Sequence, residues 1–206
     1  MTVYALKPRF QDLLRPLVAP LPSVGVTANM VTVAAALASI VAGAITAQFA
    51  ATRTVFLIIP AWLLARMALN AIDGMLARDF HQKSVLGGYL NELGDVVSDV
   101  ALYAPFALVA PFEWVGVGLV IVLSTMTEFA GAIGPSVGAS RRYDGPMGKS
   151  DRAVVFGALG LWVGFSGPMP AWLRWAMPLL AVLLVMTVVN RVRTGIRESE
   201  SAHANR

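Results

Sequence analysis

The sequence predicts an all-α, polytopic membrane protein with six transmembrane helices and both termini in the cytoplasm. Of its 206 residues, 57% are hydrophobic and only 14% are charged, and the mean hydropathy is +0.68. This composition is too apolar for an ordinary soluble domain. Apolar segments close to the length of about 20 residues that crosses a bilayer recur along the chain, and most basic residues fall on one side of them. We expect one domain over residues 1–206 with no internal repeat.

The first element is a lead-in over residues 1–26. The stretch "MTVYALKPRFQDLLRPLVAPLP" is too polar and too rich in proline for the apolar core of a cleaved signal peptide. Two interpretations stay open: an ordered polar lead-in, or an amphipathic helix at the membrane interface. The apolar side of such a helix would carry Tyr4, Leu6, Phe10, Leu13 and Leu14.

Six apolar segments follow in order, and each is a predicted membrane span. They lie near residues 31–50, 54–72, 87–111, 115–137, 153–168 and 171–190. The fifth is the shortest and is rich in glycine. The first contains "AAALASIVAGA", and small residues of this kind allow membrane helices to pack closely. Residues 191–206 form a polar tail, and its "RESESAHANR" stretch is predicted to be disordered.

Basic residues predict the orientation of these spans. Arg53 and Arg174 fall on one side, and Arg66 lies inside the second span. All the others fall on the opposite side, which the positive-inside rule makes cytoplasmic. These are Lys7, Arg9, Arg15, Arg78, Lys83, Arg141, Arg142, Lys149, Arg152, Arg191, Arg193, Arg197 and Arg206.

Composition also excludes some functions. The chain has no cysteine, so disulfides, thiolate metal sites and cysteine nucleophiles are excluded. The formal net charge is +4, but on such an apolar chain this indicates juxtamembrane Lys and Arg and not a nucleic-acid partner.

Polar residues gather in "LNAIDGMLARDFHQKSVLGGYLNELGDVVSDV", residues 69–100, at the cytoplasmic ends of the second and third spans. Ionisable groups at membrane depth are costly, so they indicate a functional site. Helical spacing places Asn70 with Asp73 on one face, and Asn91, Asp95 and Asp99 on one face of the next helix. Two helices that face each other across this loop would bring both groups together, and oxygen ligands of this kind suit Mg²⁺ or Mn²⁺.

The residues between these groups favour phosphate chemistry. Gly74 and Gly87 would let a ligand or a second backbone approach closely, and Arg78 provides a planar donor pair for phosphate. A metal ion, an arginine and a carboxylate at a membrane face indicate chemistry on a phosphorylated, lipid-linked substrate.

This stretch resembles the signature of the CDP-alcohol phosphotransferases, D-x-x-D-G-x-x-A-R, eight residues, G-x-x-x-D-x-x-x-D. Here "DGMLAR" begins at Asp73, and "GGYLNELGD" runs from Gly87 to Asp95. "VTANMVT", residues 26–32, is similar to the Pro-Asn-x-x-Thr that precedes the family's first span. The resemblance covers most of the chain and points to a bacterial inner-membrane branch of the family.

The resemblance implies an activity and roles for individual residues. Such enzymes transfer a phospho-alcohol group, typically the phosphatidyl group of CDP-diacylglycerol, to a hydroxyl acceptor and release CMP. It implies Asp95 as general base, one or two Mg²⁺ or Mn²⁺ ions, membrane lipids as surroundings, a homodimer, and a multi-pass inner-membrane protein whose site faces the cytoplasm. The implied metal ligands are Asn70, Asp73, Asn91 and Asp95, and the implied CDP-alcohol contacts are Gly74, Ala77, Arg78 and Gly87.

Two positions depart from the family pattern, because Asn70 and Asn91 replace its first and third aspartates. An amide oxygen still binds a hard cation, but each replacement removes a negative charge. A single ion, or a second ion held mainly by the diphosphate, would fit such a site. Glu92 and Asp99 are candidates to restore the charge.

Several charged residues also have structural interpretations. Asp99 is either a helix-packing partner or an acid of the site, and Glu128 is expected to pair inside the bundle, with Arg66 as one candidate. His81 is expected to be solvated. The loop "RRYDGPMGKSDR", residues 141–152, is at least a positive-inside loop, and its Lys149 and Arg152 are candidates to bind an anionic acceptor or headgroup.

Three functions therefore remain. The first is a transferase of phospholipid synthesis, and the second is a catalytically impaired relative that binds CDP-lipid or a membrane partner. A transporter is the third and weakest, because the polar groups gather at one face and not at the midplane. Retention of Asp95 and Arg78 favours the transferase.

Overall fold

A computed structural model describes residues 6–166 and 169–204. The described residues form seven α-helices joined by short 3₁₀ turns, so the all-α prediction is confirmed. The helices are α1 Leu6–Val18, α2 Ala28–Gln48, α3 Ile58–Asp79, α4 Val85–Tyr103, α5 Trp114–Ala132, α6 Lys149–Phe165 and α7 Ala176–Ala204. The 3₁₀ turns are η2 Pro22–Val24, η3 Arg53–Leu57, η4 Ala104–Leu108, η5 Gly134–Val137 and η6 Ala171–Trp175.

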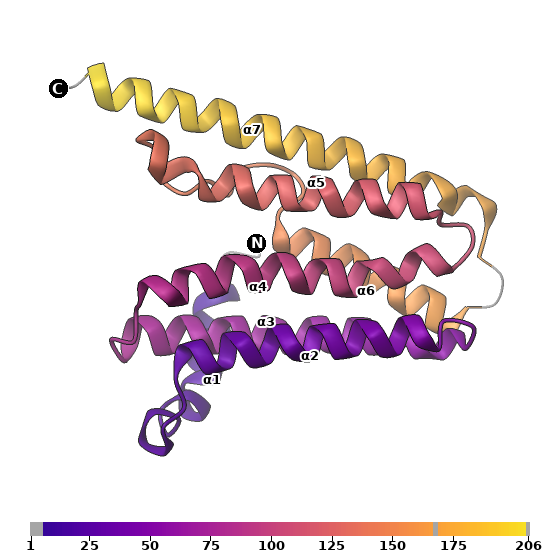
Figure 1. Cartoon of the computed structure of the whole chain (residues 1–206), viewed down its shortest axis with the longest axis horizontal. Coiled ribbons are helices and arrows are strands. Elements are labelled where there is room, and N and C mark those ends of the chain that lie inside the picture. The colour runs from indigo at the N-terminus through magenta and orange to yellow at the C-terminus, as the bar shows by residue number, and fades with distance from the viewer. Residues whose placement is uncertain (1–5, 167–168, 205–206) are drawn as a thin grey trace.

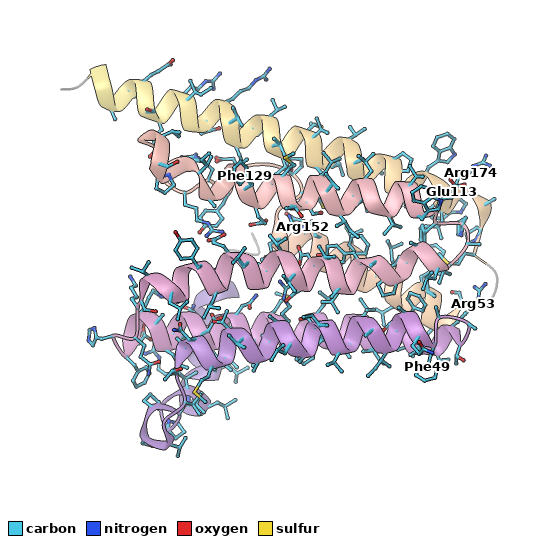
Figure 2. The ribbon with its side chains drawn as sticks, in the orientation of Figure 1. Phe49, Arg53, Glu113, Phe129, Arg152 and Arg174 are labelled. Atoms are coloured by element: carbon cyan, nitrogen blue, oxygen red, sulfur yellow. The ribbon has the colours of Figure 1, made fainter. Side chains whose placement is uncertain are left out.

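The long helices run side by side as a bundle (Figure 1). Helices α3 and α4 both pack on α2, α5 packs on α7, and α6 packs on α3 and η3. Arg53, Glu113 and Arg174 lie together at one end of the bundle (Figure 2), and the C-terminal end of α7 lies at the other. The two basic residues predicted to be extracytoplasmic, Arg53 and Arg174, therefore share an end.

Small residues let α2 approach its neighbours closely. Its buried positions include Ala35, Ser39, Ala42 and Gly43. A Cβ atom on Gly43 would lie 2.1 Å from the carbonyl oxygen of Ala101 on α4, so only glycine fits at this crossing. The close packing predicted for the first span is therefore confirmed, and it holds α4 against α2 near the C-terminal ends of both helices.

The apolar core fills the half of the bundle away from the polar cluster. Tyr103 and Phe156 stack with their ring centroids 3.7 Å apart, and Phe106 meets Phe156 edge-on at 5.3 Å. These side chains are fully buried and come from α4, η4 and α6. Aromatic packing of this kind stabilises the bundle beyond simple burial, and it fixes α6 relative to α4.

Among the described residues, four helical segments could cross a membrane by length and composition: Ala28–Gln48, Arg53–Asp79, Trp114–Ala132 and Ala171–Ala202. The chain is accordingly a membrane protein. Helix α4 occupies the predicted third span but carries Glu92, Asp95 and Asp99, and α6 occupies the fifth with only 17 residues. The count of six spans and the side on which the termini lie stay predictions.

The two ends of the chain differ from expectation in part. Residues 6–18 do form a helix, in which Leu14 is buried while Leu13 and Leu17 point outward; Tyr4 lies outside the described residues, and the Leu6 side chain is not described. The prediction of a disordered tail is wrong for residues up to Ala204, because α7 continues through them. Glu198 explains this, since its carboxylate accepts hydrogen bonds from Ser140 and Arg142.

Candidate active site

Polar side chains of α2, α3 and α4 form one cluster. Asp73 on α3 and Asp95 on α4 are both buried, with exposed fractions of 7% and 8%. Thr32 of α2 donates a hydrogen bond of 2.9 Å to Oδ2 of Asp73. Asp73 also lies within electrostatic range of Asp95 and Lys149. The sequence predicted that two helices would form this cluster, whereas the structure adds a third.

Asp95 is held by two cations through the same oxygen. Arg66 Nη2 lies 3.1 Å from Asp95 Oδ1 and also donates to its backbone carbonyl at 3.1 Å. Lys149 Nζ also donates to Oδ1 of Asp95. Within the described residues, Oδ2 of Asp95 has no hydrogen-bond partner, so one oxygen of this carboxylate is free to act on a ligand.

Asp99, one turn further along α4, lies between two arginines. Its Oδ1 accepts from Arg66 Nη1 at 2.7 Å, and its Oδ2 accepts from Arg152 at 2.8 Å. Both arginines are almost fully buried, and Figure 2 shows Arg152 in the interior of the bundle. Both carboxylate oxygens are thus engaged, which favours the helix-packing interpretation of Asp99.

The prediction that Glu128 pairs inside the bundle is confirmed, but Arg66 as its partner is wrong. Glu128 does pair inside the bundle, but with Arg152 at 2.9 Å and, at longer range, with Arg191 at 3.8 Å and Arg141 at 3.7 Å. Arg66 turns instead toward α4, where Asp95 and Asp99 lie. Helical periodicity gives the face of a side chain but not the helix that this face meets, so the partner could not be chosen from the sequence.

Ion pairs tie the 138–148 connection to α4 and α7. Arg141 pairs with Glu92, so this carboxylate already has a cation as its partner. Arg142 hydrogen-bonds to both oxygens of Asp144, and this holds the pKa of the Asp144 carboxyl below its usual range. These pairs fix the segment that leads into Lys149, the first residue of α6.

The two asparagines lie on α3 and α4, as predicted from the helical spans. Asn70 and Asn91 are half-buried, and their side chains form no hydrogen bond with other described residues. The described part of the chain contains no group of three or more His, Cys, Asp or Glu side chains arranged to hold a metal ion. The predicted donors are two carboxylates and two amide oxygens, and an all-oxygen set of this kind would suit a hard divalent cation.

The predicted CDP-alcohol contacts lie on the same helices. Arg78 is exposed, and its Nη1 lies 3.0 Å from the position that a Cβ atom on Gly74 would take. Gly74 therefore leaves room for the guanidinium group to fold back along α3. A Cβ atom on Gly87 would lie 2.7 Å from Oδ1 of Asn29 on α2. Ala77 is half-buried beside them on α3.

Sequence reasoning assigned no role at the site to Thr32, Asn29 or Arg66. Thr32 and Asn29 lie within "VTANMVT", so the motif that supported the resemblance also held the signal that these residues reach the site. Arg66 is an arginine within a predicted span, and that alone marks a functional or structural partner. His81 is exposed, as predicted.

The fold is shared with an enzyme of phospholipid synthesis. Three crystal structures of phosphatidylinositol phosphate synthase (PgsA1) from Mycobacterium tuberculosis match it over 87% of this chain. The form with CDP-DAG bound has a TM-score of 0.72 at 23% identity over 92% of its own chain. The manganese and citrate complex gives 0.70 at 24% over 87%, and the apo form gives 0.68 at 24% over 94%.

At 23–24% identity, these matches show that the two proteins share a fold, and the signature residues lie on α3 and α4 of this fold. By sequence, the chain belongs to the same family as the inner membrane protein YnbA of Escherichia coli (strain K12), to which it is 43% identical over 197 residues. That similarity covers 94% of this chain and 96% of YnbA. No family model matches the sequence.

Proposed function

We propose that the chain transfers a phosphatidyl group from a CDP-alcohol, specifically CDP-diacylglycerol, to a hydroxyl acceptor and releases CMP. The observation that carries this proposal is the state of Asp95. Arg66 and Lys149 fix its Oδ1, while Oδ2 has no partner among the described residues. A carboxylate held in place with one free oxygen is suited to accept a proton from a bound hydroxyl group.

The donor would bind along α3. Arg78 is the exposed guanidinium of the site, and it can contact a diphosphate with two parallel hydrogen bonds. Gly74 and Ala77 present little side chain on the way, and Gly87 of α4 lies close to Asn29 of α2. The CDP-DAG complex of the mycobacterial enzyme supports a donor of this class, because that protein has the same fold.

A divalent cation, Mg²⁺ or Mn²⁺, would be held by Asp73, Asp95, Asn70 and Asn91. When bound, it would act as a Lewis acid on the diphosphate. The all-oxygen donor set supports this assignment, as does the manganese complex of the structural neighbour. Asp99 and Glu92 are less suited as ligands, because arginines already engage their carboxylates.

The transfer itself uses Asp95 as general base. The acceptor hydroxyl gives its proton to Oδ2 of Asp95 while its oxygen bonds to the phosphorus of the phosphatidyl group. The bond from that phosphorus to the oxygen of CMP breaks, and CMP leaves with the bonding electrons. Arg66 keeps the base in place throughout, because it contacts both the carboxylate and the backbone carbonyl of Asp95.

The location and oligomeric state of the protein are proposed from the family resemblance and from the similarity to YnbA. We propose a multi-pass protein of the bacterial inner membrane with its site at the cytoplasmic face, and YnbA is itself described as an inner membrane protein. A homodimer is proposed from family resemblance. Lys149 lies beside Asp95 and is the candidate to bind an anionic acceptor, whereas Arg152 is buried with its guanidinium engaged by Asp99 and Glu128.

The test is a transferase assay with the purified chain in detergent. The chain receives radiolabelled CDP-diacylglycerol, Mg²⁺ or Mn²⁺, and a panel of alcohols and phosphorylated alcohols. We expect CMP release that depends on the acceptor, with a new labelled lipid as product. Measurable CDP-diacylglycerol binding with no CMP release for any acceptor would instead identify a catalytically impaired relative.

A further inference from the structure

Lys149 is the feature of the site that the transfer reaction leaves unexplained. It is the first residue of α6, where the partial positive charge of the helix N-terminus disfavours a second cation. The capping contact there comes from Asp151, which accepts a hydrogen bond of 2.9 Å from the amide of Gly148. The ammonium group of Lys149 itself reaches across to Oδ1 of Asp95 on α4. The carboxylate that pairs with Lys149 therefore comes from α4, while Asp151 of α6 caps the helix.

The contact joins Lys149 to the carboxylates that would bind a metal ion. Asp95 is buried, and the side chain of Lys149 is 30% exposed, so the pair lies at the boundary between the site and solvent. Lys149 also acts electrostatically on Asp73. An ammonium group and a divalent cation would compete for these carboxylates, because both seek their negative charge.

The charges at the site decide how many cations it can hold. Asp73 and Asp95 contribute two negative charges, Asn70 and Asn91 contribute none, and Lys149 returns one positive charge. One divalent ion already turns this set positive, and a second would be repelled at short range. Asp99 does not relieve the repulsion, since Arg66 and Arg152 already neutralise it.

We infer that Lys149 is a built-in cation that competes with divalent ions for Asp95 and limits the site to one metal ion. The inference deepens the proposed function and rests on its metal site, although the test needs no turnover. Lys149 is thus a residue that sets metal stoichiometry.

The test counts Mn²⁺ ions bound to the purified chain without nucleotide, by the electron paramagnetic resonance signal of free Mn²⁺. We compare the native chain with Lys149→Met, which removes the charge, and Lys149→Arg, which keeps it. Lys83→Met is the matched control, because Lys83 is an exposed lysine in the α3–α4 loop. Lys149→Met should bind Mn²⁺ with a Kd about tenfold lower or bind a second ion, while the other two variants match the native chain.

The same Kd and the same number of ions in Lys149→Met and the native chain, including no binding to either, would overturn the inference. If Lys149→Met does not fold, amine-reactive labelling of the native chain decides. Saturating Mn²⁺ should then speed labelling of Lys149 and leave Lys83 unchanged, and an unchanged rate at Lys149 would count against the inference. A chain that shows the Lys149 effect but never releases CMP would refute the transferase and retain the inference.

Discussion

Arg78 is the side chain that we propose to bind the diphosphate of the donor. It is exposed, and Gly74 leaves space for its guanidinium group beside α3. Arg78→Lys keeps the charge but loses the planar pair of donors. We expect CMP release to fall by roughly 10- to 100-fold, the value of a charged hydrogen bond, when the purified variant is assayed.

The control for this substitution is Arg193→Lys, at an exposed arginine of α7 outside the site. It should match the native rate. If Arg78→Lys also matches the native rate, Arg78 does not bind the diphosphate and the carry-over of its role is wrong.

Negative charge added at Asn70 and Asn91 tests the proposed metal site. The double substitution Asn70→Asp with Asn91→Asp restores two carboxylates on the faces that would meet the ion. At an effective dielectric constant near 20, a unit charge pair about 4 Å apart contributes roughly 4 kcal/mol before desolvation. Metal binding should therefore become tighter, as measured by titration calorimetry with Mn²⁺.

Activity of this double variant need not rise, because the site would be adapted to a single ion. The informative control is Asn190→Asp, an asparagine of α7 outside the proposed donor set, which should leave the affinity unchanged. Unchanged affinity in the double variant as well would show that neither asparagine faces the metal.

At the scale of the helices, the chain of buried ion pairs holds α3, α4, α5 and α6 together. Arg152 of α6 contacts Asp99 of α4 and Glu128 of α5, and its side chain is 1% exposed. Arg152→Met removes one cation from each of these two buried carboxylates and leaves Glu128 with only the longer contacts to Arg141 and Arg191. We expect a loss of about 3–5 kcal/mol in the free energy of unfolding, measured by denaturant titration in detergent.

Arg193→Met removes an exposed arginine and should leave the free energy of unfolding nearly unchanged. A loss no larger than this control in Arg152→Met would mean that the buried pairs do not hold the helices together. Arg152 touches neither the free oxygen of Asp95 nor Arg78. The affinity of folded Arg152→Met for CDP-diacylglycerol can therefore be compared with that of the native chain as a second measurement.

The helices could be predicted to different extents. Hydropathy located the elements, and α2, α3, α5 and α7 belong to segments that satisfy length and composition alone. Helix α4 is harder to recognise as a span because one face carries Glu92, Asp95 and Asp99, whose cations come from other helices. The helical tail was missed because its partner, the 138–142 segment, lies about 58 residues away in the chain.

The site, too, could be predicted only in part from the sequence. The motif identified Asp73, Arg78, Gly87 and Asp95 from their spacing, and the structure places them on α3 and α4. The contacts of Asp95 with Arg66 and Lys149 depend on how three helices are placed relative to one another. Spacing within one helix carries no information on that placement, so these partners could not be predicted.

For the whole molecule, the distribution of basic residues predicts the orientation in the membrane. A reporter fused after Arg206 should be cytoplasmic, and one placed in the 50–54 turn should be periplasmic. Arg53 and Arg174 share one end of the bundle, opposite the C-terminal end of α7 (Figure 2). A C-terminal reporter found outside would overturn the six-span topology and the cytoplasmic placement of the site.

Asp95 provides the most direct test of the proposed transferase. Asp95→Asn keeps the shape of the side chain but removes the base, which should lower the rate by about 10²- to 10⁴-fold. The decisive measurement is CMP release and CDP-diacylglycerol binding for the native chain and Asp95→Asn, purified in parallel. We predict that the variant still binds CDP-diacylglycerol but nearly stops releasing CMP, and near-native CMP release from Asp95→Asn would contradict the account.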